Sequence, residues 1–327
     1  MNLRLGILSA AHVHTASYVD CCKAIEGAEC LGVWDDNPER GSSFAAAHAI
    51  PFFGDMNHLL DACDAVVITA ENVHHVELAT CAAERGKHIL CEKPLATTVR
   101  DAHQMVEAAK AGGVTLMTAF PCPFSPAFAK ALDVVQRGVH GPLMAISATN
   151  RGTCPGGWFV DPALSGGGAL MDHVVHVADL MRRLLGKNAT RVHAQTGNQI
   201  HQMVCEDTAM LTLDYGSGVF ASLDSSWSRL PTYRTWGDVT LNLVFEAAVI
   251  ELDLFHQEVH HYGAGLVPHK THGFGSNLDM LMVQEFVSAI REGRPPSVTG
   301  EDGLEAVRVV EAGYRSVQSG QPESLVA

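Results

Sequence analysis

The sequence predicts a doubly wound parallel α/β sheet, followed by an open-faced antiparallel sheet with helices on one face, an α+β arrangement. Short apolar runs without alternation recur through the first 120 residues, separated by amphipathic helical segments, as in parallel strands covered on both faces. Later strands alternate polar and apolar residues, which is typical of an antiparallel sheet with one face on helices. At 327 residues the chain is long enough for two domains, which we expect over residues 1–120 and 121–327.

Each expected strand of the first domain is followed by a helix or a turn. The strands are Leu3–Ser9, Glu29–Trp34, Asp64–Thr69, His88–Cys91 and Val114–Thr118. The helices are Thr15–Ile25, Val76–Arg85 and Val99–Ala111, and a turn over Asp35–Pro38 contains a proline that suits the start of another helix. Strands and helices that alternate in this way form a Rossmann-type, dinucleotide-binding domain.

The second domain changes its hydrophobic period. Its expected helices are Pro126–Gln136, Ala169–Leu185, Leu278–Arg291 and Gly303–Ser319, with a Gly/Pro-rich loop over Gly152–Gly168. Its expected strands are Leu143–Asn150, Arg191–Gly197, Thr208–Tyr215, Val219–Trp227, Asp238–Phe245, Val249–Phe255 and Glu258–Tyr262. So few helices cannot cover both faces of these strands, and we therefore expect the exposed face to mediate self-association.

Composition excludes several classes of partner. Lys and Arg number 22 against 36 Asp and Glu, a formal net charge of −14, which disfavours nucleic acid and anionic membrane surfaces. No stretch approaches the roughly 18 apolar residues of a membrane span. The nine cysteines contain no C-x-x-C pair, which argues against a disulfide framework or a cysteine zinc site and fits a reducing, cytoplasmic location.

The loop after the first strand occupies the place of a dinucleotide-binding fingerprint, in which glycines let the backbone approach a pyrophosphate. Its three glycine positions are Ser9, Ala11 and His14. Ser and Ala are small enough to keep the turn, and we expect Ser9, Ala11 and His12 to contact the cofactor. Because His14 is bulky, the motif by itself is a weak indication of a dinucleotide.

An acidic residue is expected about 20 positions after the fingerprint, and Asp35 stands there at the end of the second strand. Its carboxylate would accept hydrogen bonds from ribose hydroxyls and repel a 2′-phosphate, so NAD is predicted in preference to NADP. No Lys or Arg adjoins it in sequence, and Arg40 is the nearest basic residue downstream. The alternative is that Asp35 only caps the following helix.

Four segments carry a family resemblance. They are Ala70–His75 (AENVHH), Gly86–Ala96 (GKHILCEKPLA), Gly166–His176 (GGGALMDHVVH) and Glu206–Ala209 (EDTA). In this order they resemble the T-P-N-x-x-H, G-K-H-V-[LF]-[CV]-E-K-P-[LIM]-A, G-G-G-x-x-x-D-x-x-x-H and E-D-T-A segments of the glucose-fructose oxidoreductase/inositol dehydrogenase/rhizopine catabolism (Gfo/Idh/MocA) family. The chain departs from the family at the glycine-free fingerprint and where Ala70-Glu71 replaces Thr-Pro.

The resemblance implies a Rossmann domain, and an open-faced sheet that often forms a homodimer or homotetramer interface. It implies a cis peptide before Pro94, cofactor contacts from Asn72, His75, Glu92 and Lys93, and activity on sugars, polyols and related carbonyl compounds.

Three residues are predicted to be catalytic. Asp172 and His176 are four positions apart, so they share one helix face, and a histidine can both accept and return the hydroxyl proton of a secondary alcohol. Lys93 leaves the fourth strand at the carboxyl end, where ligands of such sheets bind, and could polarise the substrate oxygen. In the family the matching Lys, Asp and His have these roles. The alternative for Asp172 and His176 is an ordinary helical surface ion pair.

Three further residues are predicted to contact the substrate. Arg151 and Trp158 lie in the loop before the helix, as a hydrogen-bond donor and an aromatic wall for a sugar, although Trp158 can equally be a core anchor. His173 either reaches the substrate from a neighbouring helix face or is a polar residue of a wet pocket. We predict no metal site. The alternative is a zinc-like site formed by His12, His14, Asp172, His173 and His176.

The leading functional hypothesis is an NAD-dependent dehydrogenase or reductase that moves hydride between the nicotinamide and a secondary alcohol or ketone of a sugar, polyol or derivative. Two alternatives remain. One is a lyase or glycosidase that oxidises its substrate transiently with tightly held NAD, and the other is a non-catalytic sensor of NAD or sugar with the same fold.

Overall fold

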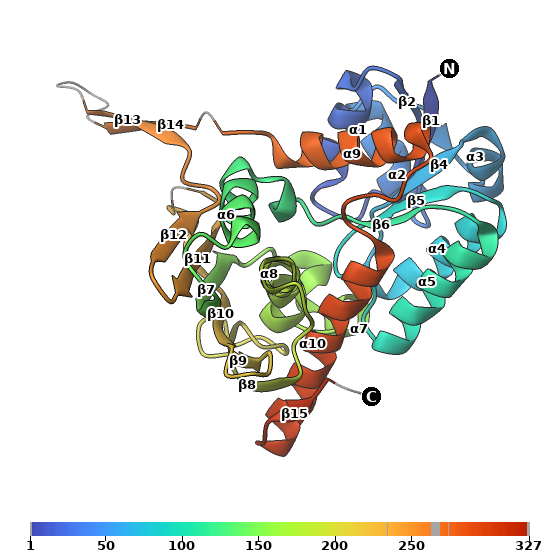
Figure 1. Cartoon of the computed structure of the whole chain (residues 1–327). Helices are drawn as coiled ribbons and strands as arrows, with labels where there is room; N and C mark the ends of the chain where they lie inside the picture. Colours follow the sequence, from blue (N-terminus) through green and yellow to red (C-terminus); the bar gives the residue numbers. More distant parts are fainter. Residues whose placement is uncertain (1, 234, 263–268, 274, 326–327) are drawn as a thin grey trace. The chain divides into compact units, whose positions relative to one another are not determined.

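The computed structural model describes residues 2–233, 235–262, 269–273 and 275–325 (Figure 1). The chain divides into two compact units. Unit 1 contains Met1–Pro121, Gly157–Gly167 and Asp279–Glu311, and unit 2 contains Cys122–Gly156, Gly168–Leu278 and Ala312–Ala327. The chain therefore returns to unit 1 twice after residue 121, a more interwoven arrangement than a single boundary near residue 120.

Unit 1 is built on a six-stranded parallel sheet in the order β3-β2-β1-β4-β5-β6. The strands are β1 Leu3–Leu8, β2 Ala28–Trp34, β3 Phe52–Phe53, β4 Ala65–Ile68, β5 His88–Cys91 and β6 Leu116–Thr118. The helices are α1 Thr15–Ala24, α2 Pro38–Ala47, α3 Met56–Ala62, α4 His75–Glu84, α5 Val99–Gly112, the short α7 Pro162–Ser165, α9 Leu278–Glu292 and most of α10 Gly300–Ser319, with 3₁₀ turns η1 Asn72–His74 and η3 Gly157–Val160. The order reverses beside β1, which confirms the predicted Rossmann-type sheet.

The apolar strands of this sheet are buried on both faces, as the sequence predicted. Every residue of β4 is fully buried, and Leu5, Ile7 and Leu90 on its neighbours are also inaccessible to solvent. Strand β3 and helix α3 are not predicted by the sequence patterns. Two residues of β3, Phe52 and Phe53, are too few to show a strand period, and α3 is only seven residues long.

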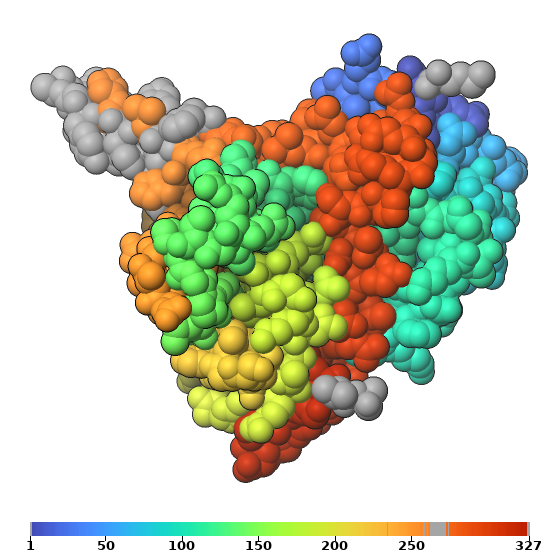
Figure 2. Space-filling view, in the orientation of Figure 1, coloured from blue at the N-terminus to red at the C-terminus, as the bar shows by residue number. Residues whose placement is uncertain are grey.

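Unit 2 is built on a seven-stranded sheet in the order β12-β11-β7-β10-β9-β8-β15. The strands are β7 Leu143–Thr153, β8 Arg191–Gly197, β9 Thr208–Asp214, β10 Phe220–Arg229, β11 Gly237–Phe245, β12 Val249–Asp253 and β15 Glu323–Ser324. Its helices are α6 Pro126–Arg137, α8 Ala169–Leu185 and the last part of α10, with a 3₁₀ turn η2 Cys122–Phe124. Helix α8 packs on β7, β9 and β10, and α6 contacts β12 at the sheet edge, where Figure 2 shows α6 in green beside β12 in orange.

The sheet of unit 2 is open-faced, as predicted, but it is mixed. Strands β7 and β10 are parallel neighbours, paired from Phe220↔Ala145 to Ser226↔Arg151, whereas the other neighbouring pairs are antiparallel. Strand periodicity cannot reveal the direction of a partner strand, because both kinds of pairing alternate their side chains. The expected strand Glu258–Tyr262 is β13, which pairs with β14 His269–Gly273 as a separate two-stranded sheet.

Candidate active site

The loop after β1 keeps a glycine-like backbone although it lacks glycine. Ser9 has a φ of +76°, in the left-handed region that favours glycine. The backbone N–H of Ala10 donates to Asp35 Oδ2 at 2.6 Å, and the Ser9 hydroxyl lies 3.3 Å from the same oxygen. Asp35 at the end of β2 therefore holds the substituted fingerprint in the turn that the glycines would otherwise allow.

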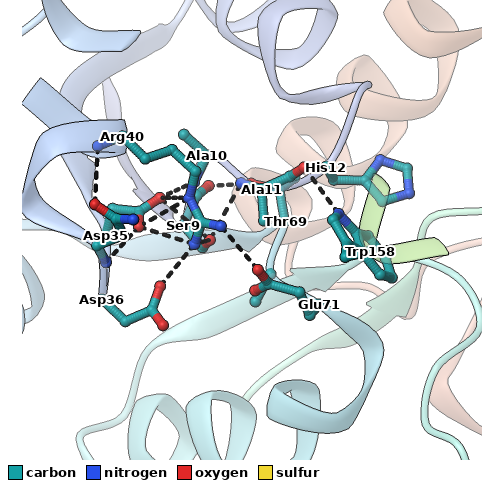
Figure 3. A network of polar contacts seen from close by, with 12 residues as sticks. Ser9, Ala10, Ala11, His12, Asp35, Asp36, Arg40, Thr69, Glu71 and Trp158 are labelled. Atoms are coloured by element: carbon teal, nitrogen blue, oxygen red, sulfur yellow. Dashed lines mark hydrogen bonds and ion pairs between the residues drawn. The ribbon is translucent and has the colours of Figure 1, made fainter. Parts of the chain in front are cut away.

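Arg40 lies beside Asp35, which corrects the sequence argument that no basic residue adjoins it. Its Nε is 3.0 Å from Asp35 Oδ2, and its terminal nitrogens are 2.7 Å from Asp36 Oδ1 and 2.8 Å from Glu71 Oε1 (Figure 3). The side chain of Asn37 caps α2, which puts Arg40 in the first turn and within reach of these carboxylates. We call Asp35, Asp36, Arg40 and Glu71 the Arg40 cluster.

Within the Arg40 cluster, the side chain of Asp35 is fully buried and ionised. Burial by itself would raise the pKa of Asp35, but hydrogen bonds from Arg40 and from the backbone amides of Ala10 and Asn37 outweigh it and lower that pKa. Three carboxylates surround one guanidinium, so the cluster is negatively charged overall. An additional phosphate at this position would be repelled.

Glu92 at the end of β5 is the centre of a second buried group. Its Oε1 accepts the hydroxyl of Tyr18 at 2.5 Å and lies 2.9 Å from His14 Nδ1 and 3.4 Å from His12 Nδ1. Its Oε2 accepts the backbone N–H of Lys93 at 2.9 Å. Burial would raise the pKa of Glu92, yet its interactions with His12 and His14, the hydrogen bond from His14 among them, and with Lys93 hold that pKa well below its usual range.

The Glu92–Lys93–Pro94 segment contains the cis peptide bond before Pro94 that the family resemblance implies. His75 at the start of α4 holds this segment, since its Nδ1 is 3.0 Å from the carbonyl oxygen of Pro94 and its Nε2 is 3.1 Å from that of Ala70. The imidazole is fully buried, and this burial lowers the pKa of His75. His75 therefore lies between the carbonyl oxygen of Pro94 in this segment and that of Ala70 after β4.

Trp158 also lies in unit 1. Its indole N–H donates to the carbonyl oxygen of Ala11 at 3.0 Å, and its ring stacks on Phe159 with centroids 3.9 Å apart. The ring of His12 lies 5.9 Å from that of Trp158 (Figure 3). The structure therefore joins Trp158 to the fingerprint loop, a contact that its position 147 residues downstream could not indicate.

In unit 2, α8 carries Asp172, His173 and His176 in its first half. The helix begins after Gly168, where a Cβ atom would meet the carbonyl oxygen of Glu206 at 2.0 Å, so only glycine fits. The Glu206 carboxylate accepts the backbone N–H of Gly168 at 2.9 Å and that of Leu170 at 3.1 Å, which satisfies amides that the helix leaves unpaired.

Asp172 Oδ2 accepts the indole N–H of Trp227 at 3.1 Å and lies 3.1 Å from Nε2 of His173. His173 is fully buried, and its Nδ1 is 3.0 Å from the carbonyl oxygen of Asn150. His176 follows Asp172 by one helical turn and is partly exposed. The sequence does not indicate this contact of Trp227, because a tryptophan in an alternating strand is more often a core residue than an orienting donor.

Arg151 lies away from this group. Gly152 faces α8, since a Cβ there would be 2.7 Å from Cε1 of His173, and neighbouring residues of a strand point to opposite faces. On the other face, Arg151 pairs with Asp238 at 3.2 Å and Asp224 at 3.5 Å. The structure thus does not bring Arg151 together with His173.

Comparison with known proteins identifies the class. Residues 6–120 match the model described as an oxidoreductase family with an NAD-binding Rossmann fold, and residues 128–251 match the C-terminal domain of the GFO/IDH/MocA family. The protein is therefore an oxidoreductase with an NAD-binding Rossmann fold. More particularly, the chain belongs to the Gfo/Idh/MocA family, as its motifs indicated.

Similar proteins cover essentially the whole chain. Myo-inositol 2-dehydrogenase of Thermotoga maritima is 24% identical over 97% of this chain and 96% of its own length. D-xylose 1-dehydrogenase (NADP(+)) 2 of Haloferax volcanii is 29% identical over 99% of this chain and 100% of its own length. The solved structure of GenD2 from gentamicin A biosynthesis, in complex with NAD, has a TM-score of 0.89 at 23% identity and covers 100% of this chain and 97% of its own. Among the described residues, no helix is long and apolar enough to cross a membrane.

A stability prediction follows from the charged network on the outer face of the unit 2 sheet, in which Asp238 pairs with Arg151 and Arg229. The pKa of Asp238 is lowered, because hydrogen bonds from Thr149 and Arg229 outweigh its burial. Replacing Asp238 by Asn should lower the free energy of unfolding at neutral pH by about 1–3 kcal/mol. A carboxyl whose folded-state pKa is depressed stabilises above its unfolded-state pKa, so this difference should shrink as the pH falls through the folded-state pKa.

Urea unfolding at neutral and acidic pH measures the effect. Asp224→Asn is the matched control, because burial raises the pKa of Asp224 and its negative charge is therefore not favoured by folding. We expect the control to cost less stability at neutral pH. A loss in Asp238→Asn that stays constant down to acidic pH would contradict this electrostatic account.

Proposed function

We propose that this oxidoreductase is an NAD-dependent dehydrogenase or reductase of a sugar, a polyol or a sugar-derived ketone. One observation carries the proposal: the chain has the Glu92–Lys93–Pro94 segment at the carboxyl end of β5 together with Asp172 and His176 one turn apart on α8. Similar proteins named as inositol and xylose dehydrogenases support the substrate class. Incubation with NAD and a panel of sugars and polyols, followed by NADH absorbance, tests it.

The residues of unit 1 fit a bound dinucleotide. The backbone of Ser9 has the left-handed conformation of a fingerprint glycine. Within the described residues, Glu71 Oε2 and Asn72 Oδ1 are buried acceptors without a hydrogen-bond partner. Because Arg40 and backbone amides already engage Asp35, we propose that Glu71 shares the ribose hydroxyls with it. The proposed cofactor contacts are Ser9, Ala11, His12, Asp35, Glu71, Asn72, Glu92 and Lys93, with His75 as a positioning residue.

The proposed mechanism assigns one role to each catalytic group. Bound NAD supplies the hydride acceptor for oxidation of the carbinol carbon. His176 takes the hydroxyl proton as hydride leaves, and returns it in the reverse direction. Asp172, oriented by the indole of Trp227, stabilises the imidazolium that forms on His176. The Lys93 ammonium polarises the substrate oxygen, and the hydrogen bond from its backbone amide to Glu92 orients the segment.

For the substrate we propose Trp158 as an aromatic wall, since its indole is partly exposed and its N–H is already engaged. His173 is proposed as a positioning residue for Asp172, because its ring is fully buried between Asp172 and Asn150. Arg151 is not proposed as a substrate contact, since Asp224 and Asp238 pair with its guanidinium.

We propose that the protein self-associates through the outer face of the unit 2 sheet, as a homodimer or homotetramer. Cross-strand register aligns Phe220, Ala145, Val244 and Val249 in one row over β10, β7, β11 and β12. Phe220 is 55% exposed and Val249 is 62% exposed, although both are apolar. A second copy of the chain would cover this row. We further propose the cytoplasm as its location, from the cysteine content alone.

The first functional prediction concerns proton transfer. His176→Ala should lower turnover by the roughly 10²–10⁴-fold typical of a lost acid/base group, while the dissociation constant of NAD stays nearly unchanged. The pH profile of the unmodified enzyme should contain a histidine limb that the variant lacks. Lys93→Ala should reduce turnover and also weaken the binding of NAD. Full activity with an unchanged pH profile in His176→Ala would assign the proton to another group.

The second functional prediction concerns cofactor choice. The unmodified chain should bind NAD more tightly than NADP in calorimetry, because the Arg40 cluster carries excess negative charge. Asp35→Ser removes one carboxylate and leaves Arg40 facing the ribose. The ratio of the dissociation constants of NADP and NAD should therefore fall by about tenfold, equivalent to about 1.4 kcal/mol. Asp36→Ser is the control, since Asp36 is 57% exposed and better screened, and it should change the preference less. Tighter binding of NADP to the unmodified chain would refute the assignment.

The third functional prediction concerns assembly. Light scattering at micromolar concentration should report a dimer or larger species. Phe220→Glu should shift the protein toward monomers, because it would bury a charge in the contact. Val204→Glu is the control, an exposed apolar residue outside the strands of the sheet, and should leave the mass unchanged. A monomeric mass for the unmodified protein would contradict the proposed interface.

A further inference from the structure

Three potential metal ligands converge on one point beside the fingerprint loop. They are Nδ1 of His12, Nδ1 of His14 and Oε1 of Glu92, and all lie within 4.8 Å of one another. The oxygen of Glu92 is 2.9 Å from His14 and 3.4 Å from His12. All three residues belong to unit 1. The side chains of Glu92 and His12 are buried, whereas that of His14 is 36% exposed, so this point is open on one side.

Hydrogen bonding accounts for only one of the two contacts between imidazole and carboxylate. A proton on His14 Nδ1 explains the 2.9 Å distance to Glu92. However, His12 Nδ1 accepts the backbone N–H of His14 at 3.2 Å, so this nitrogen carries a lone pair and no proton. The lone pair of His12 and the oxygen of Glu92 then face each other at 3.4 Å. Two electron-rich atoms in this position favour a cation between them.

We propose that His12, His14 and Glu92 bind a divalent metal ion of the zinc class. Two histidines and one glutamate are the ligands of one type of catalytic zinc site, which keeps its fourth position for water or substrate. Zinc bonds of about 2.0–2.1 Å in a tetrahedron place ligand atoms about 3.3 Å apart, close to the separations seen here. This proposal replaces the expectation of no metal, and it does not depend on the proposed hydride transfer.

The surroundings of Glu92 support a ligand role. Carboxylate ligands are usually held by outer hydrogen bonds that fix their orientation. The Tyr18 hydroxyl donates to Oε1 and the Lys93 backbone amide donates to Oε2. Tyr18 is fully buried, one helical turn after His14 on α1. The fourth position of the metal would take water or a hydroxyl oxygen of a substrate.

Titration calorimetry with Zn²⁺ tests the site on the full chain after chelator treatment and dialysis. Because other histidines bind zinc weakly, the quantity measured is the number of tight equivalents. We expect one in the unmodified chain and none in His14→Gly, which introduces the residue that the fingerprint has at this position. His58→Ala is the control, since its side chain is 77% exposed, and it should keep the tight equivalent.

A second variant separates metal binding from folding. Tyr18→Phe keeps the ring and removes the hydroxyl that donates to Glu92, so the affinity for Zn²⁺ should fall by roughly 10–100-fold. Substitution with Co²⁺ should produce the absorption bands of a tetrahedral site in the unmodified chain but not in His14→Gly. No tight equivalent in the unmodified chain, or the same equivalent in His14→Gly, would overturn the proposal. An unchanged affinity in Tyr18→Phe would also count against it.

Discussion

A carboxylate without solvent exposure must be matched by donors or positive charge, and the buried Glu92 imposes this requirement on the carboxyl end of the unit 1 sheet. Tyr18 of α1 and His14 of the fingerprint loop turn toward it. The Lys93 amide donates to the same carboxylate, which fixes the backbone of Lys93 at the end of β5. His75 adds to this support, since its Nδ1 lies within hydrogen-bond distance of the carbonyl oxygen of Pro94.

The second constraint is the loss of the fingerprint glycines. A dinucleotide loop needs a left-handed residue and exposed backbone amides, which glycine supplies without a side chain. Here Ser9 adopts the left-handed conformation, and Asp35 accepts the amide of the next residue. Arg40 then balances part of the charge at Asp35, and Glu71 accepts a hydrogen bond from the same guanidinium. The substitution of Thr-Pro by Ala70-Glu71 and the loss of glycine are therefore connected, because Glu71 binds the arginine that holds Asp35.

Much of the fold was predictable because buried parallel strands leave long apolar runs, and the family motifs identified both domains. The direction of β10 relative to β7 and the two-residue β3 were not predictable, since neither leaves a periodic signal. In the site, the roles of Asp172 and His176 follow from helical spacing and stay predictions. The Arg40 cluster and the Glu92 group depend on side chains that approach across strands. Tyr18 left a usable signal in its four-residue spacing from His14.

The central claim is that this chain moves hydride between a carbinol carbon and NAD. The most direct measurement uses sugars and polyols deuterated at the carbinol carbon, incubated with the purified chain and NAD, with mass spectrometry of the cofactor. The account predicts that deuterium from the substrate carbon appears on the reduced nicotinamide in a stoichiometric ratio. NAD and a sugar that bind together without any transfer of deuterium to the cofactor would contradict it.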